Sequence, residues 1–372
     1  MKKEFLTANA KFVYSKNELG YQEVLDNFEK ASKITIITYN ISEKKSALVS
    51  ALKKAGEHCV INVITNIPSR WEKYYSDTFR DNAKRKINLY LLKLSPEKLG
   101  INPTVFFDFS NHGKIIMTDS VVYVGSANYS EESANNTEFG FISRDKEFLN
   151  FIDSEVLPDV KTSSIPYYEY DYTALLLEAN VVLSAIYNIK NELHDEVYRL
   201  HDDVDGEWYY YVEHEATLTI STLDNIVKII GEACKVSSKI YDTIDNITNG
   251  DEDELIVANN VYEDLLTQFS GIEEIRGSDT IIELSEFDSE KYINQKLQEE
   301  YAMEAYEDNL DNCIERASDE AQNIILDLTQ AAKDDIDELI GEIQSFCETY
   351  SSFIEILRTK EIKKISPQID NT

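Results

Sequence analysis

Hydrophobic and polar positions follow two different rhythms along the chain, and the change comes near residue 165. In the first part, runs rich in β-branched and aromatic residues are typical of strands. They cover residues 33–42, 58–66, 87–94, 104–110, 112–119 and 120–128. Amphipathic stretches that predict helices cover residues 20–32, 43–56 and 71–86. This alternation predicts an α/β domain with a mixed sheet flanked by helices.

The second part predicts helices almost throughout. Apolar residues recur every three or four positions from Leu175 to Leu200 and from Ile325 to Leu357, as on the buried stripe of an amphipathic helix. Polar breaks near residues 202–206, 249–253 and 277–279 separate the helical stretches. We therefore expect an all-α bundle or a long helical hairpin.

Charge divides the chain at the same place. Residues 1–165 contain 22 Lys and Arg against 21 Asp and Glu, whereas residues 166–372 contain 14 against 48, so the net charge changes from +1 to −34. We interpret the two parts as separate domains, the second strongly acidic. Its acidic residues form either a plain solvated exterior or a surface used for regulation, dimerisation or partner docking.

The remaining composition restricts the class of protein. No apolar run approaches the ~20 residues needed to span a bilayer, and the N-terminal lysines are not followed by the apolar core of a signal peptide. The four cysteines are widely scattered without the spacing of metal ligands. We expect a cytoplasmic protein that needs no membrane, metal or other cofactor.

Candidate chemistry is concentrated in residues 109–133. His112 and Lys114 are two positions apart on a predicted strand, so their side chains share a face, and Ser126 and Asn128 are related in the same way. The intervening run reads as a hairpin that turns at residues 119–120. All four groups share one face only if the residue numbers of positions paired across the hairpin add up to an even number, for example His112 opposite Asn128. Such a cluster of imidazole, ammonium and amide groups suits an anionic tetrahedral centre.

The same residues resemble a known family. The pattern His112-Gly-Lys114 with Asp119, followed by Gly125-Ser-Ala-Asn128, resembles the HxKxxxxD and GSxN signature of the phospholipase D superfamily, and bacterial nucleases of that superfamily in particular. The resemblance covers roughly residues 20–160 and implies a phospholipase D-like catalytic domain. The acidic helical part has no counterpart in the family core.

The resemblance implies a role for each matching position. His112 would be the nucleophile that forms a phosphohistidine, while Lys114 and Asn128 would bind the phosphoryl oxygens and Ser126 would assist them. Glu138, in the stretch after the GSxN run, would orient the imidazole from behind.

Two further motif positions are expected to be structural. Asp119 lies at the predicted hairpin turn, where its side chain can cap its own backbone. Gly125 opens the GSxN run. We expect neither residue to take part in catalysis.

The single motif has a consequence for assembly. The reaction needs a second histidine to protonate the leaving oxygen and then to activate water, and the chain has no second HxK sequence. Single-motif members of the family form homodimers, so the resemblance implies an active site that contains His112 from both protomers. We therefore expect an inactive monomer.

The substrate is less well defined by the sequence. The single motif and a segment with six basic residues, Arg70–Lys86, favour nucleic acid over phospholipid. We expect a metal-independent nuclease, with the acidic part gating it or docking a partner, for example in a bacterial antiviral defence or restriction complex. The alternatives are a phospholipid-cleaving enzyme of the same superfamily and a scaffold without catalysis.

Other signals have ordinary structural interpretations. His58, His194, His201 and His214 lack companions that complete a site, so surface or core positions are expected. Two tyrosine-rich segments, residues 164–172 and 207–214, favour packing over base stacking because acidic residues accompany them.

Overall fold

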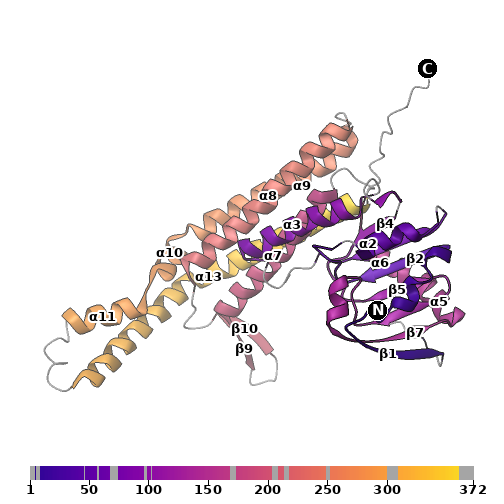
Figure 1. Cartoon of the computed structure of the whole chain (residues 1–372). Coiled ribbons are helices and arrows are strands. Elements are labelled where there is room, and N and C mark those ends of the chain that lie inside the picture. The colour runs from indigo at the N-terminus through magenta and orange to yellow at the C-terminus, as the bar shows by residue number, and fades with distance from the viewer. Residues whose placement is uncertain are drawn as a thin grey trace. The chain divides into compact units, whose positions relative to one another are not determined.

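The computed structural model of this chain divides into two compact units (Figure 1). The first contains Met1–Val181, Asp242–Gly250 and Ile356–Thr372, and the second contains Val182–Tyr241 and Asp251–Glu355. The structure describes residues 5, 9–45, 47–56, 58–67, 74–95, 99–101, 103–167, 173–202, 208–212, 218–248, 252–299 and 309–359. The expected domain boundary after residue 165 stays a prediction.

The first unit is built on a mixed sheet of eight strands in the order β1-β7-β6-β5-β2-β3-β4-β8. The strands are β1 (Ala10–Lys16), β2 (Lys33–Thr38), β3 (Val60–Thr65), β4 (Thr104–Phe107), β5 (Ile115–Thr118), β6 (Val122–Gly125), β7 (Thr137–Ser143) and β8 (Ile165–Pro166). Strand β3 runs parallel to β2 and β4, and the other neighbouring pairs are antiparallel. The sequence prediction of an α/β domain with a mixed sheet is therefore confirmed.

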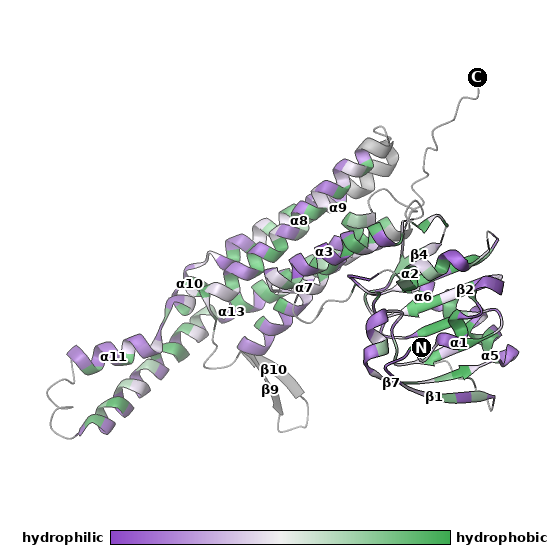
Figure 2. Cartoon of the chain, in the orientation of Figure 1, coloured by the Kyte–Doolittle hydropathy of each residue, from purple (hydrophilic) through white to green (hydrophobic). Residues whose placement is uncertain are grey.

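The helices of the first unit are α1 (Gln22–Leu25), α2 (Ala47–Ala51), α3 (Asp77–Lys93), α5 (Lys146–Phe151) and α6 (Leu157–Ser163). Of these, α5 and α6 pack on the sheet through their apolar side chains. Leu157 of α6 packs against buried residues of β2, β3 and β4. Leu149 of α5 packs against buried residues of β5 and β6. Figure 2 shows the hydrophobic character of the central strands in green.

One predicted strand is wrong. Residues 87–94 were expected to be extended, but residues 87–93 form the second half of α3. The buried residues Ile87, Tyr90 and Leu94 are three and four positions apart, which is the spacing of a helix and not the alternation of a strand. An apolar run of this length does not distinguish a buried strand from a helix by itself.

The rest of the chain is mainly helical, as expected. The helices are α7 (Thr173–Val197), α8 (Ile220–Thr248), α9 (Glu252–Arg276), α10 (Asp279–Glu286), α11 (Ser289–Glu299) and α13 (Leu310–Thr359). In α13, the apolar stripe from Ala332 to Leu357 is buried, and hydrophobic and polar residues alternate along its surface (Figure 2). The predicted breaks at residues 249–253 and 277–279 coincide with helix ends. None of the helices that the structure describes is both long and apolar enough to cross a bilayer.

A short hairpin is an addition that the helical periodicity did not predict. Strands β9 (Tyr198–Asp202) and β10 (Trp208–Val212) pair in an antiparallel register, and the predicted polar break at residues 202–206 falls at their connection. Strand β10 takes in most of the second tyrosine-rich segment, whose aromatic residues favour extended backbone. Of the first segment, residues 168–172 lie outside the described residues.

Candidate active site

The predicted site residues gather at one edge of the sheet. Strand register places Ile37 near the end of β2 opposite Ile115 at the start of β5. Gly125 ends β6 and pairs with Gly140 of β7. The segments that leave β2 and β6 and those that enter β5 and β7 are therefore neighbours. These segments carry the histidine, lysine, serine, asparagine and glutamate of the motif.

The loop before β5 is fixed by a buried asparagine. Asn111 donates a hydrogen bond from Nδ2 to the carbonyl of Thr38 at 2.8 Å, and its Oδ1 accepts one from the backbone N–H of Gly113 at 2.9 Å. Its own carbonyl accepts a hydrogen bond from Asn66 Nδ2 at 2.9 Å. Asn111 thus ties the loop to the ends of β2 and β3, which leaves the next residue, His112, exposed to solvent.

His112 and Lys114 are in contact. Lys114 Nζ lies 3.3 Å from His112 Nδ1 and also donates to the His112 carbonyl. The ring of Tyr39, which follows β2, lies 4.9 Å from the imidazole between centroids, and Lys114 Nζ lies 5.3 Å from the same ring. A cation near an aromatic face gains electrostatic stabilisation. The three side chains form one cluster that combines an imidazole, an ammonium group and an aromatic ring.

Lys114 has a perturbed pKa because it is 9% exposed. Burial lowers the pKa of its ammonium group, and the negative charge of Glu138 opposes part of that effect. Desolvation disfavours the charged form of a lysine, whereas a nearby carboxylate favours it. Glu138 therefore helps to keep Lys114 positively charged.

Ser126 and Glu138 are joined directly. The Ser126 hydroxyl donates to the Glu138 carboxylate and accepts from the backbone N–H of Phe139 at 3.0 Å. Asn136 Nδ2 also donates to Glu138, at 3.4 Å. The hydrogen bonds described for Glu138 thus go to Ser126 and Asn136 and not to the ring of His112, which is the partner that the resemblance implies.

Gly125 is required by a tyrosine that lies across it. A Cβ atom at Gly125 would lie 2.3 Å from Tyr123 Oη and 2.4 Å from the carbonyl oxygen of Phe139. Tyr123 Oη donates to that carbonyl at 3.2 Å and accepts from the Ala127 N–H at 3.3 Å. The glycine lets the tyrosine hold the loop that carries Ser126 and Asn128.

Asn128 is held by buried hydroxyl groups. Its carbonyl accepts a hydrogen bond from Tyr21 Oη at 3.1 Å, and its Oδ1 lies 3.5 Å from Thr38 Oγ1, which donates to the Asn40 carbonyl at 2.9 Å. Thr38 Oγ1 also accepts from the Tyr129 N–H at 2.9 Å. Burial raises the pKa of Tyr21, so its hydroxyl stays protonated and remains a donor.

The register of the hairpin differs from the expected one. Ile115 lies opposite Val124, and the Thr118 N–H donates to the Val121 carbonyl, so opposed positions add up to an odd number. On ideal strands this register would place His112 and Lys114 on one face of the sheet and Ser126 and Asn128 on the other. The expected even sum is not a requirement here, because these residues lie beyond the ends of β5 and β6. The backbone there is irregular, and side chains no longer alternate strictly between the two faces.

Asp119 lies at the hairpin turn, at the opposite end of β5 from His112. Its carboxylate accepts hydrogen bonds from the N–H of Ser32 at 3.2 Å and from the Ser32 hydroxyl at 2.6 Å. It therefore caps the segment that enters β2, and not its own backbone as expected. The turn itself is capped by Thr118 Oγ1, which accepts from the N–H groups of Ser120 and Val121.

The basic segment that was expected to contact phosphate is engaged within the protein. Arg80 is 1% exposed and donates to backbone carbonyls and to Asp77. Arg85 and Lys86 both pair with Glu43, at 3.4 and 3.3 Å. The first four residues of the segment lie outside the described residues. The described side chains therefore give little support to this segment as a nucleic-acid footprint.

The structure describes three of the other four histidines. His58 is exposed, and His194 lies 3.6 Å from the carboxylate of its neighbour Asp195. His201 lies on β9, and His214 lies outside the described residues. Within the part of the chain that the structure describes, no group of three or more His, Cys, Asp or Glu is arranged to hold a metal ion.

Sequence reasoning missed the residues that support the site. Thr38 ends the buried strand β2 and Tyr39 follows it, and Asn66 follows β3 in the same way. Polar residues at the carboxyl ends of neighbouring parallel strands often line a site in α/β folds, and that signal was present in the sequence.

The first part of this chain is similar to known proteins. Residues 24–157 match the family described as "Cardiolipin synthase, PLD-like domain". Among solved structures, Nuc, a phospholipase D family member from Salmonella typhimurium, is 18% identical over 42% of this chain and 97% of its own, with a TM-score of 0.31. NucT from Helicobacter pylori is 16% identical over 42% of this chain and 100% of its own, with a TM-score of 0.30.

A third similarity is to a polyphosphate kinase from Porphyromonas gingivalis. It is 11% identical over 61% of this chain and 36% of its own, with a TM-score of 0.30. None of the curated proteins matches this chain.

Proposed function

This chain belongs to the phospholipase D superfamily through the domain of residues 24–157, and on that premise we propose that it is a metal-independent nuclease that cleaves DNA or RNA. The observation that carries the proposal is the contact between the exposed imidazole of His112 and the buried Lys114, 3.3 Å apart. A nucleophile beside a cation is what the displacement at a phosphodiester requires.

The reaction proceeds in two displacements. A ring nitrogen of His112 attacks phosphorus, the bond from phosphorus to the leaving oxygen breaks, and a phosphohistidine forms. The leaving oxygen takes a proton from the partner's His112. That imidazole then removes a proton from water, whose oxygen displaces the His112 nitrogen from phosphorus. Lys114 and the amide of Asn128 stabilise the negative charge that develops on the non-bridging oxygens.

The contact with Lys114 also sets the tautomer of the nucleophile. While a protonated Lys114 donates to Nδ1, the proton of a neutral ring must be on Nε2, so neither nitrogen is free to attack. When Lys114 turns to the phosphoryl oxygens, Nδ1 can take the ring proton and Nε2 becomes the nucleophile. Substrate binding thus activates His112 through the movement of Lys114.

A homodimer supplies the second histidine. His112 is exposed at the edge of the sheet, and the sequence contains no second copy of the motif. A two-fold axis brings identical surface patches together, so two such edges would face each other. We propose that only the dimer is active.

An exposed aromatic face favours nucleic acid as the substrate. Phe12, Tyr14, Phe139 and Phe141 of β1 and β7 are each at least 50% exposed, and their rings contact one another. The pair of Tyr14 and Phe139 lies near the sheet edge that carries the motif, because Ser15 is opposite Glu138. Exposed aromatic side chains stack on nucleic-acid bases without sequence preference.

The acidic helical part is proposed to gate the enzyme or to dock a protein partner, for example in a bacterial antiviral defence or restriction complex. Its net charge of −34 repels nucleic acid over about a Debye length, ~10 Å at moderate salt. Deletion of residues 170–372 tests gating. If the truncated enzyme is dimeric and its activity and salt dependence are unchanged, gating is wrong. Docking of a partner or a plain solvated exterior would then remain.

A substrate panel tests the proposed function. Wild-type protein and the His112→Ala variant are incubated with labelled DNA, RNA and phospholipid, each with EDTA present. We expect cleavage of a nucleic acid by the wild type and none by the variant. Phospholipid turnover would instead support the alternative enzyme, and no activity on any substrate would support a scaffold.

A further inference from the structure

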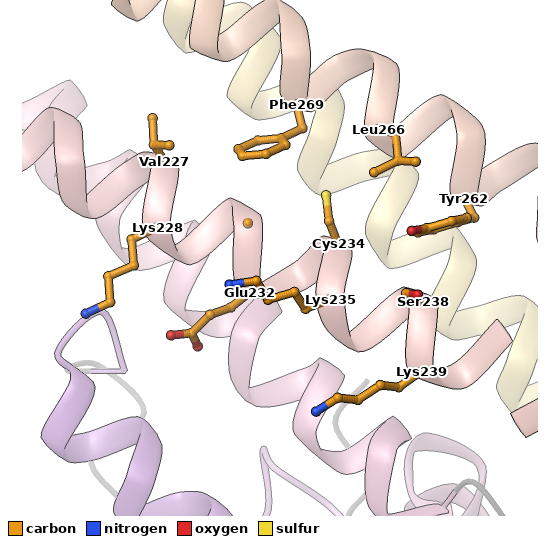
Figure 3. A pocket seen from close by; sticks show the side chains of 11 residues that line it. Val227, Lys228, Glu232, Cys234, Lys235, Ser238, Lys239, Tyr262, Leu266 and Phe269 are labelled. Carbon is orange, nitrogen blue, oxygen red and sulfur yellow. The ribbon is translucent and has the colours of Figure 1, made fainter. Parts of the chain in front are cut away.

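A pocket in the acidic helical unit lies between α8 and α9 (Figure 3). All the residues that line it belong to the second compact unit. Its volume is about 740 Å³, within the range of about 300–1,000 Å³ that small-molecule sites occupy. The pocket is therefore large enough for a ligand, and it shares no residue with the proposed active site.

One wall of the pocket is apolar and comes mainly from α9. Tyr262, Leu266 and Phe269 point toward α8 (Figure 3), and Leu266 is 38% exposed. The ring of Tyr241 stacks on Tyr262 with centroids 6.2 Å apart, which extends the aromatic surface. Cys234 adds a further apolar group from α8, because burial raises the pKa of its thiol to about 11 and keeps it uncharged.

The other wall is cationic. Lys228, Lys235 and Lys239 lie along α8 on the side of the pocket away from α9 (Figure 3). Glu232 lies among them, so the charged side chains of the pocket sum to +2. Residues 166–372 contain 14 basic and 48 acidic residues. Three of those 14 lysines and arginines thus line one side of this pocket, in a part of the chain whose other charges are mostly negative.

The opening between the two walls depends on a glycine. Gly231 faces Phe269, and a Cβ atom there would lie 3.5 Å from Phe269 Cζ, an ordinary contact distance. An alanine would fit, but a longer side chain would enter the space between the helices. The absence of a side chain at this position leaves the aromatic wall accessible.

We propose that this pocket binds a small amphipathic anion, whose acidic group contacts the lysines of α8 and whose apolar body lies against the aromatic wall of α9. Charge complementarity selects the anion, and apolar burial supplies the larger part of the affinity. Fatty acids and nucleotides both have this chemistry. The proposal does not depend on the phosphodiesterase function.

Binding of two fluorescent probes to the full chain tests the proposal. Anilinonaphthalene sulfonate is an amphipathic anion, and N-phenylnaphthylamine is its neutral analogue without the sulfonate. Gly231→Leu should abolish binding of both probes. A double variant, Lys228→Gln with Lys235→Gln, should weaken the anionic probe about fivefold and leave the neutral probe within about twofold, because partly exposed charges each contribute modestly.

Matched variants provide the controls. Lys333→Gln removes one positive charge, half the change made by the double variant, at an exposed position of α13 and should leave both affinities unchanged. Phe12→Ser with Phe141→Ser removes part of the exposed sheet face and should also have no effect. Circular dichroism and thermal unfolding show whether each variant is folded.

The outcomes separate the possible ligands and can overturn the proposal. Displacement of the anionic probe by dodecanoate identifies a lipid-like ligand, and displacement by adenosine monophosphate identifies a nucleotide. Displacement by neither would mean adventitious dye binding and would overturn the proposal. The same holds if folded Gly231→Leu binds normally, or if the Phe12 and Phe141 variant loses the signal.

Discussion

Nζ of Lys114 lies 3.3 Å from Nδ1 of His112, although the lysine is buried and the histidine is exposed. The arrangement places a cation beside the proposed nucleophile before any substrate is present. It also gives Lys114 two tasks in the proposed mechanism, which are to stabilise the phosphoryl oxygens and to control the tautomer of His112.

Removal of the Lys114 charge should reduce turnover more than binding. Lys114→Met keeps the length of the side chain and is expected to lower kcat by about 10²- to 10³-fold, the usual effect of removing a donor that stabilises transition-state charge. Steady-state kinetics on the substrate found in the panel measures it. Lys333→Gln is the charge-matched control, and a Lys114→Met enzyme with normal kcat would remove the lysine from the mechanism.

Glu138→Gln should lower the pKa of Lys114. The Glu138 carboxylate raises that pKa against the lowering effect of burial, so loss of its charge lowers the pKa further. A nitrogen-15 NMR titration of the Lys114 ammonium group measures this pKa directly, with the wild type as the reference. An unchanged or higher pKa of Lys114 in the variant would contradict this electrostatic role.

Gly125→Ala should destabilise the protein through Tyr123. The new methyl group would meet Tyr123 Oη and the carbonyl of Phe139 at less than van der Waals distance. Overpacking of this kind costs about 1–3 kcal/mol of the free energy of unfolding, which thermal denaturation detects as a lower Tm. Gly56→Ala is the matched control, since a Cβ there has nothing within 4 Å. Equal stability of the two variants would argue against a steric requirement at Gly125.

Mixed dimers should reveal a shared active site. If each site needs His112 from both protomers, mixing wild type with His112→Ala leaves only wild-type homodimers active. Activity after subunit exchange should then fall as the square of the wild-type fraction. A linear fall would show that each protomer works alone, and size-exclusion chromatography of both proteins checks that dimers form.

The sequence predicted the sheet and the position of the motif because both depend on local patterns. The β-branched run of residues 33–42 and the HxK and GSxN spacings each lie within a short stretch of chain. Residues 87–94 were misjudged because a short apolar run fits a buried helix as well as a strand. The register of the β5–β6 hairpin was also not predicted. The expectation assumed that the site residues lie on the strands, whereas they lie past the strand ends.

The partners of the site residues could not be read from the sequence for a different reason. Asn111 reaches the carbonyl of Thr38, and Thr38 reaches Asn128, across separations of 73 and 90 residues. Asp119 was expected to be structural, and its partner Ser32 lies 87 residues away. Such contacts follow from the order of strands in the sheet, which one sequence alone does not specify.

Trapping of the covalent intermediate tests the central claim most directly. Wild-type protein is mixed with the cleaved substrate, quenched with alkali under conditions that preserve phosphohistidine, digested and analysed by mass spectrometry. The account predicts a phosphoryl-linked substrate fragment on the peptide that contains His112, and none on the Lys114→Met or His112→Ala proteins at the same time point. Cleavage by the wild type with the adduct on another residue, or with the His112→Ala protein equally active, would contradict it.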